Sequence, residues 1–154
     1  MCNKIIVKKI FLISYFLFFS TVCLYSAEEY FLTLRNEKVN LRQGPSFKYP
    51  IKIFYKKKYL PVLVQDKSDN FRKIRDHENN TGWIHISQLS KKKAAIVIDD
   101  DLIMFKNPTI YSKPIVILKK GKLSKIIKCK MEWCKAEVDN YKGWVKKVSL
   151  WGLL

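Results

Sequence analysis

After residue 27 the chain consists of short apolar runs separated by polar turns. Between residues 39 and 42 apolar and polar side chains alternate, which is typical of a strand with one buried face. No later segment keeps the 3.6-residue period of a helix. Further strands are predicted at residues 31–34, 51–54, 62–64, 71–74 and 83–86. Several short strands joined by tight turns favour a small β-barrel.

This pattern occurs twice. Residues 39–89 and 102–150 follow one template, in which an opening strand leads to a proline turn and a Gly-Trp pair comes near the end. In both copies a leucine follows the tryptophan of that pair by six residues. A repeat of about 60 residues is too long for a solenoid unit and suits a small self-contained domain. The chain is therefore predicted to be all-β, with two tandem copies of one domain.

The predicted boundaries are a targeting segment at 1–27, a first domain at 28–90 and a second at 91–154. The lysine run at 91–93 marks the linker. Because this linker is only a few residues long, we expect the two copies to pack against each other. Domains of this size are also close to the lower limit for an independent core. For the same reason we expect four aromatic residues to lie in the core or at its rim, namely Phe71, Trp83, Trp133 and Trp144.

The first 27 residues have the features of a secretory signal peptide. A lysine-containing start precedes an apolar run over residues 10–25, and Ser26-Ala27 provides small residues for cleavage. We therefore expect an exported protein, periplasmic or associated with the cell envelope. Tyr25 is bulky for the third position before the cut, so retention as an N-terminal membrane anchor is the alternative. Lipid attachment at Cys23 is a weaker alternative, because Val22 precedes it.

The two cysteines after this segment, Cys129 and Cys134, are separated by four residues. This spacing suits a β-hairpin in which the two residues face each other across the strands, at a distance compatible with a disulfide. The alternative is a reduced, half-buried pair. A zinc site would need more Cys or His at ligand spacing, and none is near. We predict a disulfide and neither a metal nor a cofactor.

The chain is strongly basic, with a formal net charge of +17. Without the three lysines of the targeting segment, 27 basic residues stand against 13 acidic ones, a net charge of +14. Only four of the basic residues are arginine, whereas nucleic-acid sites depend on arginine for planar bidentate contacts. We therefore expect no nucleic-acid partner, and only weak, salt-dependent attraction to anionic membranes or polymers.

The opening Val39–Pro45, with Tyr49-Pro50-Ile51 after it and Gly82–His85 near the end, resembles the bacterial SH3 (SH3b) family, and in particular its exported tandem-domain branch. Cys129, Trp133-Cys134, Gly143-Trp144-Val145 and the closing Leu150-Trp151-Gly152 carry the resemblance in the second copy. The resemblance covers nearly all of the chain after residue 27. It implies two SH3-like barrels and a binding role toward peptidoglycan or envelope proteins, often as an accessory to hydrolases.

The opening motif includes Asn40, Gly44 and Pro45. Gly44 permits a turn with positive φ, and Pro45 fixes the next φ, so the motif predicts a pre-set loop. The second copy departs from the motif, because Phe105 replaces Arg42 and Asn107 replaces Gly44. This departure argues against a ligand shared by both copies and favours a structural role for the second copy, closed by Cys129 and Cys134; whether the second copy binds a ligand of its own is left open.

Arg42 alternates with Leu41 and is predicted to point outward, where a guanidinium can bind a carboxylate. We expect an aromatic groove beside it, since aromatic faces stack on sugars and peptide side chains. For Tyr49 and Tyr55 core packing is an equal alternative. The candidate ligand-binding residues are Arg42, Tyr49, Tyr55, Tyr59, Trp83 and His85, with Lys56–Lys58 at the edge.

The sequence offers little for catalysis. It has two histidines, His77 and His85, and neither a nucleophile elbow nor a phosphate-binding glycine loop. Asp99-Asp100-Asp101 is predicted to be a solvated turn. The leading hypothesis is a non-catalytic, exported module that binds peptidoglycan or another cell-wall component. The alternatives are an envelope scaffold that binds a protein and, third, an accessory hydrolase; the oligomeric state is left open.

Overall fold

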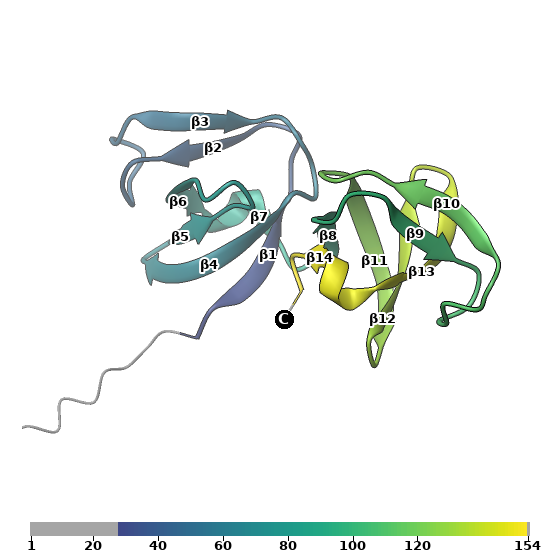
Figure 1. Ribbon diagram of the computed structural model, residues 1–154. Coiled ribbons are helices and arrows are strands. Elements are labelled where there is room, and N and C mark those ends of the chain that lie inside the picture. Colours follow the sequence, from purple (N-terminus) through teal and green to yellow (C-terminus); the bar gives the residue numbers. More distant parts are fainter. Residues whose placement is uncertain (1–27, 154) are drawn as a thin grey trace, which may run out of the picture.

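The computed structural model describes residues 28–153 and contains two β-domains joined by residues 91–93 (Figure 1). The first domain consists of β1 (Tyr30–Leu34), β2 (Val39–Arg42), β3 (Ile51–Tyr55), β4 (Pro61–Ser68), β5 (Phe71–Arg75), β6 (Thr81–His85), the 3₁₀ turn η1 (Ile86–Gln88) and β7 (Leu89–Ser90). The second consists of β8 (Ala94–Val97), β9 (Leu102–Phe105), β10 (Pro114–Leu118), β11 (Leu123–Lys130), β12 (Trp133–Val138), β13 (Tyr141–Lys146), η2 (Lys147–Ser149) and β14 (Leu150–Trp151).

Both domains have the same antiparallel topology. The strand order is β3-β2-β6-β5-β4-β1-β7 in the first sheet and β10-β9-β13-β12-β11-β8-β14 in the second. In each, the lead-in strand pairs with the long fourth strand on one side and with the short last strand on the other. Each sheet therefore curves around its own core (Figure 1). The predicted all-β fold with two tandem small barrels is confirmed.

The alternation of apolar and polar residues determines which side chains enter the core. In β2, Val39 and Leu41 are fully buried, whereas Asn40 and Arg42 are half-buried. The first core is built mainly from such inward positions of β1, β2, β4, β5 and β6. The second core repeats this arrangement around Met104, Ala136 and Val145.

The two domains pack against each other, as expected. Ile96 of β8 belongs to the core cluster of the first domain, and Leu123 of β11 packs against it. Phe31 and Trp151 meet edge to face, with ring centroids 4.9 Å apart. The Thr33 hydroxyl donates a hydrogen bond of 2.9 Å to the carbonyl of Lys92 in the linker.

Neither tryptophan of the two Gly-Trp pairs enters the core. In β6 the inward positions belong to Gly82 and Ile84, so Trp83 between them is half-buried on the outer face. A Cβ on Gly82 would lie 2.7 Å from the carbonyl oxygen of Arg42 and 2.7 Å from Leu41 Cγ. The close approach of β2 to β6 therefore fills the inward space, and only glycine fits there.

The second domain repeats this arrangement. A Cβ on Gly143 would lie 2.5 Å from Met104 Cγ and 2.7 Å from the carbonyl oxygen of Phe105. Trp144 is accordingly half-buried on the outer face of β13. Of the two predicted positions, the core or its rim, these tryptophans therefore take the rim, on the outer face.

The predicted disulfide between Cys129 and Cys134 is present. The two residues are direct cross-strand partners at the end of the β11–β12 hairpin, with Cα atoms 4.0 Å apart. The corresponding cross-strand pair in the first domain is Lys67 opposite Arg72. The disulfide therefore belongs to the second domain alone.

The predictions for the N-terminus concern residues 1–27, which lie outside the described part of the chain. They are the signal peptide, its alternative as an anchor, and lipid attachment at Cys23. Among residues 28–153, no helix is long and apolar enough to cross a membrane.

The glycine before Trp83 provides a test of the fold. Gly82→Ala should lower the free energy of unfolding by about 2 kcal/mol, because the added methyl group must displace the β2 backbone or Leu41. Urea denaturation followed by tryptophan fluorescence measures this. Thr81→Ala, at the exposed neighbouring position, is the matched control and should change stability by less than about 0.5 kcal/mol. Equal effects of the two substitutions would contradict the close approach.

Candidate functional site

The candidate site is centred on Trp83, on the outer face of the first sheet. Trp83 lies opposite Arg42 of β2 on one side and opposite Lys73 of β5 on the other. A hollow beside it is lined by Gln43, Lys52, Lys73, Thr81, Gly82 and Trp83. Because Gly82 and Ile84 point inward, the indole of Trp83 between them faces this hollow. Arg42 and Lys73, the two cationic residues, lie beside it.

Arg42 lies at this site, but part of its guanidinium group is hydrogen-bonded to the protein backbone. Its Nη1 donates hydrogen bonds to the carbonyl oxygens of Phe47 (3.1 Å) and Tyr49 (2.8 Å). Its guanidinium carbon is also 5.5 Å from the centre of the Phe47 ring. The predicted outward orientation is found, but Arg42 also braces the loop 43–50. Only its remaining N–H groups are available to a ligand.

Three aromatic rings lie together beside Arg42. The ring centroids of Phe47, Phe71 and His85 are 5.1–5.2 Å apart in each pair. Phe71 is buried, while Phe47 is 63% exposed, so the cluster runs from the interior to the surface. His85 is held from its other side, because its Nδ1 lies 2.7 Å from the Ser87 hydroxyl. Sequence reasoning missed Phe47, because nothing in the local pattern shows that its loop folds back onto β5 and β6.

Tyr49 lies at the base of the same loop. Its side chain is 47% exposed, and its ring covers Gly44. A Cβ on Gly44 would lie 2.7 Å from ring atoms of Tyr49. Gly44 does not have the predicted positive φ. The glycine is therefore required for contact with the tyrosine ring rather than for a left-handed turn.

Tyr55 does not belong to this surface. It is 9% exposed, and its hydroxyl donates a hydrogen bond of 2.8 Å to Oδ2 of the buried Asp76. Asp76 also accepts hydrogen bonds from the backbone N–H groups of Glu78 and Asn80 and from the Asn80 side chain. Burial, then the hydrogen bond with Asp76, raises the pKa of Tyr55 far above its usual value. Tyr55 is a core residue that anchors the turn between β5 and β6.

The second domain keeps the backbone of the site and changes its side chains. Trp144 lies opposite Phe105 and Lys135, as Trp83 lies opposite Arg42 and Lys73. The Lys106 N–H donates to the carbonyl of Lys113 (3.0 Å), which matches the bond from Gln43 to Pro50 (3.1 Å). However, Phe105 packs on Trp133 at a centroid distance of 5.8 Å and has no guanidinium to brace the loop. The position equivalent to His85 holds Lys146.

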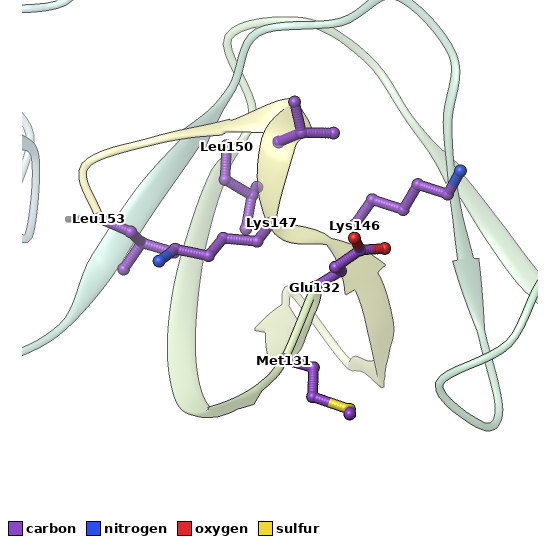
Figure 2. A pocket seen from close by; sticks show the side chains of 7 residues that line it. Met131, Glu132, Lys146, Lys147, Leu150 and Leu153 are labelled. Carbon is purple, nitrogen blue, oxygen red and sulfur yellow. The ribbon is translucent and has the colours of Figure 1, made fainter.

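A different hollow lies at the end of the second domain, beside the disulfide-closed hairpin (Figure 2). It is lined by Met131, Glu132, Lys146, Lys147, Val148, Leu150 and Leu153. The hairpin is held there by a hydrogen bond of 2.7 Å from the Lys147 N–H to the carbonyl of Glu132. Figure 2 shows the Lys146 and Lys147 side chains pointing in opposite directions.

The described residues offer no group of three or more His, Cys, Asp or Glu side chains that could hold a metal ion. Asp99–Asp101 is an exposed turn, in which Asp101 pairs with Lys119. The Nε2 atom of His77 lies 3.9 Å from the Oε1 atom of the neighbouring Glu78.

Tyr55 generates a prediction on pH dependence. Because the folded pKa is raised above the unfolded value near 10, the phenol stabilises the fold fully below that pH and progressively less above it. The wild-type protein should therefore lose stability above about pH 10 more steeply than Tyr55→Phe does. At pH 7 the substitution should cost about 1–2 kcal/mol, because Asp76 loses a buried donor. Denaturant titrations from pH 7 to 11 measure both effects; parallel curves for the two proteins would contradict the assignment.

Several solved structures match this chain at low sequence identity. NlpC2 and NlpC1 of Trichomonas vaginalis both share 11% sequence identity with it, with TM-scores of 0.36, over 80% and 85% of this chain. An NlpC/P60 family protein of Bacillus cereus ATCC 10987 shares 12% identity, with a TM-score of 0.36, over 78% of this chain. The matches cover 48%, 48% and 55% of those proteins, so the chain spans about half their length. No curated protein sequence matches the chain significantly.

The model of the family described as "Bacterial SH3 domain" matches the sequence twice, at residues 35–91 and 99–152. Each match begins just after the lead-in strand of its sheet and extends through the Gly-Trp pair and the 3₁₀ turn to just beyond the short last strand. The two matches together cover well over half of the chain and agree with the repeated topology. The chain belongs to the bacterial SH3 domain family and carries two such domains in tandem.

Proposed function

We propose that this protein is a non-catalytic binding module of the bacterial cell envelope, and that its first SH3 domain binds peptidoglycan through the surface around Trp83. The observation that supports this most is the position of a half-buried indole between Arg42 and Lys73, above a hollow. The signal-peptide features of residues 1–27 support an exported location, either released or N-terminally anchored.

The chemistry of this surface suits a glycan that carries acidic peptides. A half-buried indole is a rigid, amphipathic platform on which a sugar ring can stack at little entropic cost. Lys73 and the free N–H groups of Arg42 provide positive charge for peptide carboxylates. Lys52, which also lines the hollow, donates a hydrogen bond of 3.2 Å to the carbonyl of Thr81. The cations therefore flank the aromatic platform.

A catalytic role receives no support from the local chemistry. The contact between Ser87 and His85 is a capping interaction, since the His85 side chain also accepts from the Ser87 N–H at the start of η1. A nucleophile and base pair needs a third group that orients the base, and no carboxylate of residues 28–153 bonds to His85. The thiols of Cys129 and Cys134 are joined to each other.

Retention on purified peptidoglycan sacculi tests the proposal. Trp83→Ala should reduce retention about tenfold, the upper range for loss of an aromatic stacking contact. The substitution should leave the domain folded, because the side chain lies outside the core. Arg42→Ala and Tyr49→Ala should also weaken retention through the loop that they support.

Trp144→Ala is the matched control, because it occupies the equivalent strand position in the second domain. It should leave retention unchanged. The measurement is made at about 0.1 M and 1 M salt, where the Debye lengths are about 10 Å and 3 Å. If Trp83→Ala and Trp144→Ala behave alike, or if all binding disappears at the higher salt, the specific site is wrong.

The second candidate function is an envelope scaffold that binds a protein. It is favoured by the hollow of the second domain, where Met131 and Val148 are 88% and 79% exposed. The equivalent positions in the first domain hold the polar residues Asp69 and Ser87. Site-specific crosslinking from position 148 in cells should capture one defined partner under this hypothesis, and Met131→Asp should abolish that capture.

A further inference from the structure

Three lysine side chains from separate segments converge on Tyr59 at the junction of the domains. Lys58 lies in the turn between β3 and β4, Lys92 in the linker, and Lys125 in β11 of the second domain. Their Nζ atoms are 5.4, 5.3 and 5.7 Å from the centre of the Tyr59 ring. The Lys92 ammonium also donates a hydrogen bond of 3.4 Å to the Tyr59 hydroxyl oxygen. One phenol is thus surrounded by positive charge from both domains.

The backbone of Tyr59 adopts a conformation that favours glycine. Its φ is +66°, and its N–H donates to the carbonyl of Leu34 at 2.9 Å. In the second domain the equivalent bond, 2.8 Å long, runs from Gly121 to Val97, and Gly121 has a φ of +79°. The first domain therefore places a large aromatic residue where its sister domain has glycine. Strained positions of this kind are found where the side chain itself is needed.

The three lysines form no ion pair among residues 28–153, although Glu137 is the cross-strand partner of Lys125. None of Lys58, Lys92 and Lys125 lies within 4.0 Å of a carboxylate oxygen in residues 28–153. The nearby acids that line the adjoining hollow, Glu137 and Asp139, pair with other lysines. Any two of the three ammonium groups are at most about 11 Å apart, close to the Debye length of about 8 Å at physiological ionic strength. At that upper limit the repulsion between exposed charges is largely screened, so it acts only between ammonium groups that lie closer together.

Two other lysines extend this positive surface. Lys57 donates to the carbonyl of Gly121 at 3.5 Å, across the junction, and Lys122 pairs with Asp139 at 2.7 Å. Both line the adjoining hollow together with Lys125. Lys125 lines this hollow, whereas Lys92 lines a different one. The junction therefore presents lysine donors from both domains, with the Tyr59 hydroxyl hydrogen as a further donor.

We propose that the domain junction is a phosphate-binding site formed by Lys58, Lys92, Lys125 and the Tyr59 hydroxyl. Lysine ammonium groups bind phosphate as point charges, without the planar bidentate contact that arginine makes to phosphate and carboxylate alike. A phosphate group has enough oxygens to accept from several ammonium groups at once and relieves their repulsion. Because the lysines belong to the first domain, the linker and the second domain, a bound phosphate bridges the two barrels. The phosphate can belong to a free oligophosphate or to a phosphodiester polymer of the envelope.

This site is separate from the proposed peptidoglycan surface. None of its residues lines the hollow beside Trp83. Failure of one proposal therefore leaves the other intact, and Trp83→Ala should not affect phosphate binding.

Calorimetric titration of the protein with inorganic tripolyphosphate tests the proposal. Lys92→Gln and Lys125→Gln should each weaken binding about threefold to fivefold, the upper range for a partly exposed ion pair. Lys106→Gln is the matched control, because it removes the same charge from the loop between β9 and β10, at the far end of the second domain (Figure 1). A loss that is equal for all three variants would show a general polyanion effect and would overturn the site.

Tyr59 provides a second, spectroscopic readout. The hydrogen bond from Lys92, followed by the charges of Lys92, Lys58 and Lys125, lowers the pKa of Tyr59. Absorbance titration at high pH should therefore show one early phenolate step that Tyr59→Phe removes. Tripolyphosphate should move this step to higher pH, since its negative charge opposes ionisation of the phenol. If the step does not move, or remains in Tyr59→Phe, the site is wrong.

The same titration distinguishes the two sources of phosphate. A synthetic glycerol-phosphate oligomer that binds more tightly than tripolyphosphate, with the same dependence on Lys92 and Lys125, identifies a phosphodiester polymer. The reverse order identifies a free oligophosphate. Single-stranded DNA that outcompetes both, with no dependence on these lysines, overturns the proposal.

Discussion

The close approach of β2 to β6 is the constraint on which the rest of this structure depends. At Gly82 the inward space is occupied by Leu41 and by the backbone of Arg42, so no side chain larger than hydrogen fits. The strand alternation then turns Trp83 outward and sets it between Arg42 and Lys73. A requirement of packing inside the barrel thus creates the aromatic platform outside it.

The second domain has the same close approach of two strands at its glycine, but the side chains on the surface around its tryptophan differ. Gly143 takes the inward space, and Trp144 the outer face, with Phe105 in place of Arg42. The loop after β9 keeps the backbone hydrogen bonds of the first domain. The two copies therefore share one backbone geometry. The surface side chains beside the tryptophan differ between the copies, because the fold does not depend on them. Binding roles can change in one copy without disturbing the fold.

The strands could be predicted because they depend on local alternation and turns. The repeat followed from matching motifs, the linker from the lysine run at 91–93 and the disulfide from the spacing of two cysteines, without knowledge of the tertiary structure. The orientation of Trp83 could not be read in this way, because a glycine leaves no sign of which face it occupies. Trp83 and Ile84 are adjacent apolar residues on opposite faces of β6, and the sequence does not show which of them enters the core until the neighbours of Gly82 are known.

The candidate site was predicted less completely for a related reason. Tyr55 and Tyr49 are both tyrosines next to turns, but only Tyr55 meets a buried acid, Asp76, which comes from a turn 21 residues later. Phe47 joins the aromatic cluster because its loop folds back, held by the Arg42 guanidinium. Such long-range contacts decide between core and surface. These contacts cannot be predicted from residue type and spacing in the sequence.

The central claim is that the first domain binds peptidoglycan through its Gly-Trp tryptophan and the second does not, although both present a tryptophan at the same place. The most direct test follows the four indole N–H signals of the protein by NMR while soluble muropeptides are added. The account predicts that the Trp83 signal shifts in proportion to ligand bound, while the signals of Trp133 and Trp144 stay in place. A shift of Trp144 equal to that of Trp83, or no shift of Trp83 at saturating ligand, would contradict it.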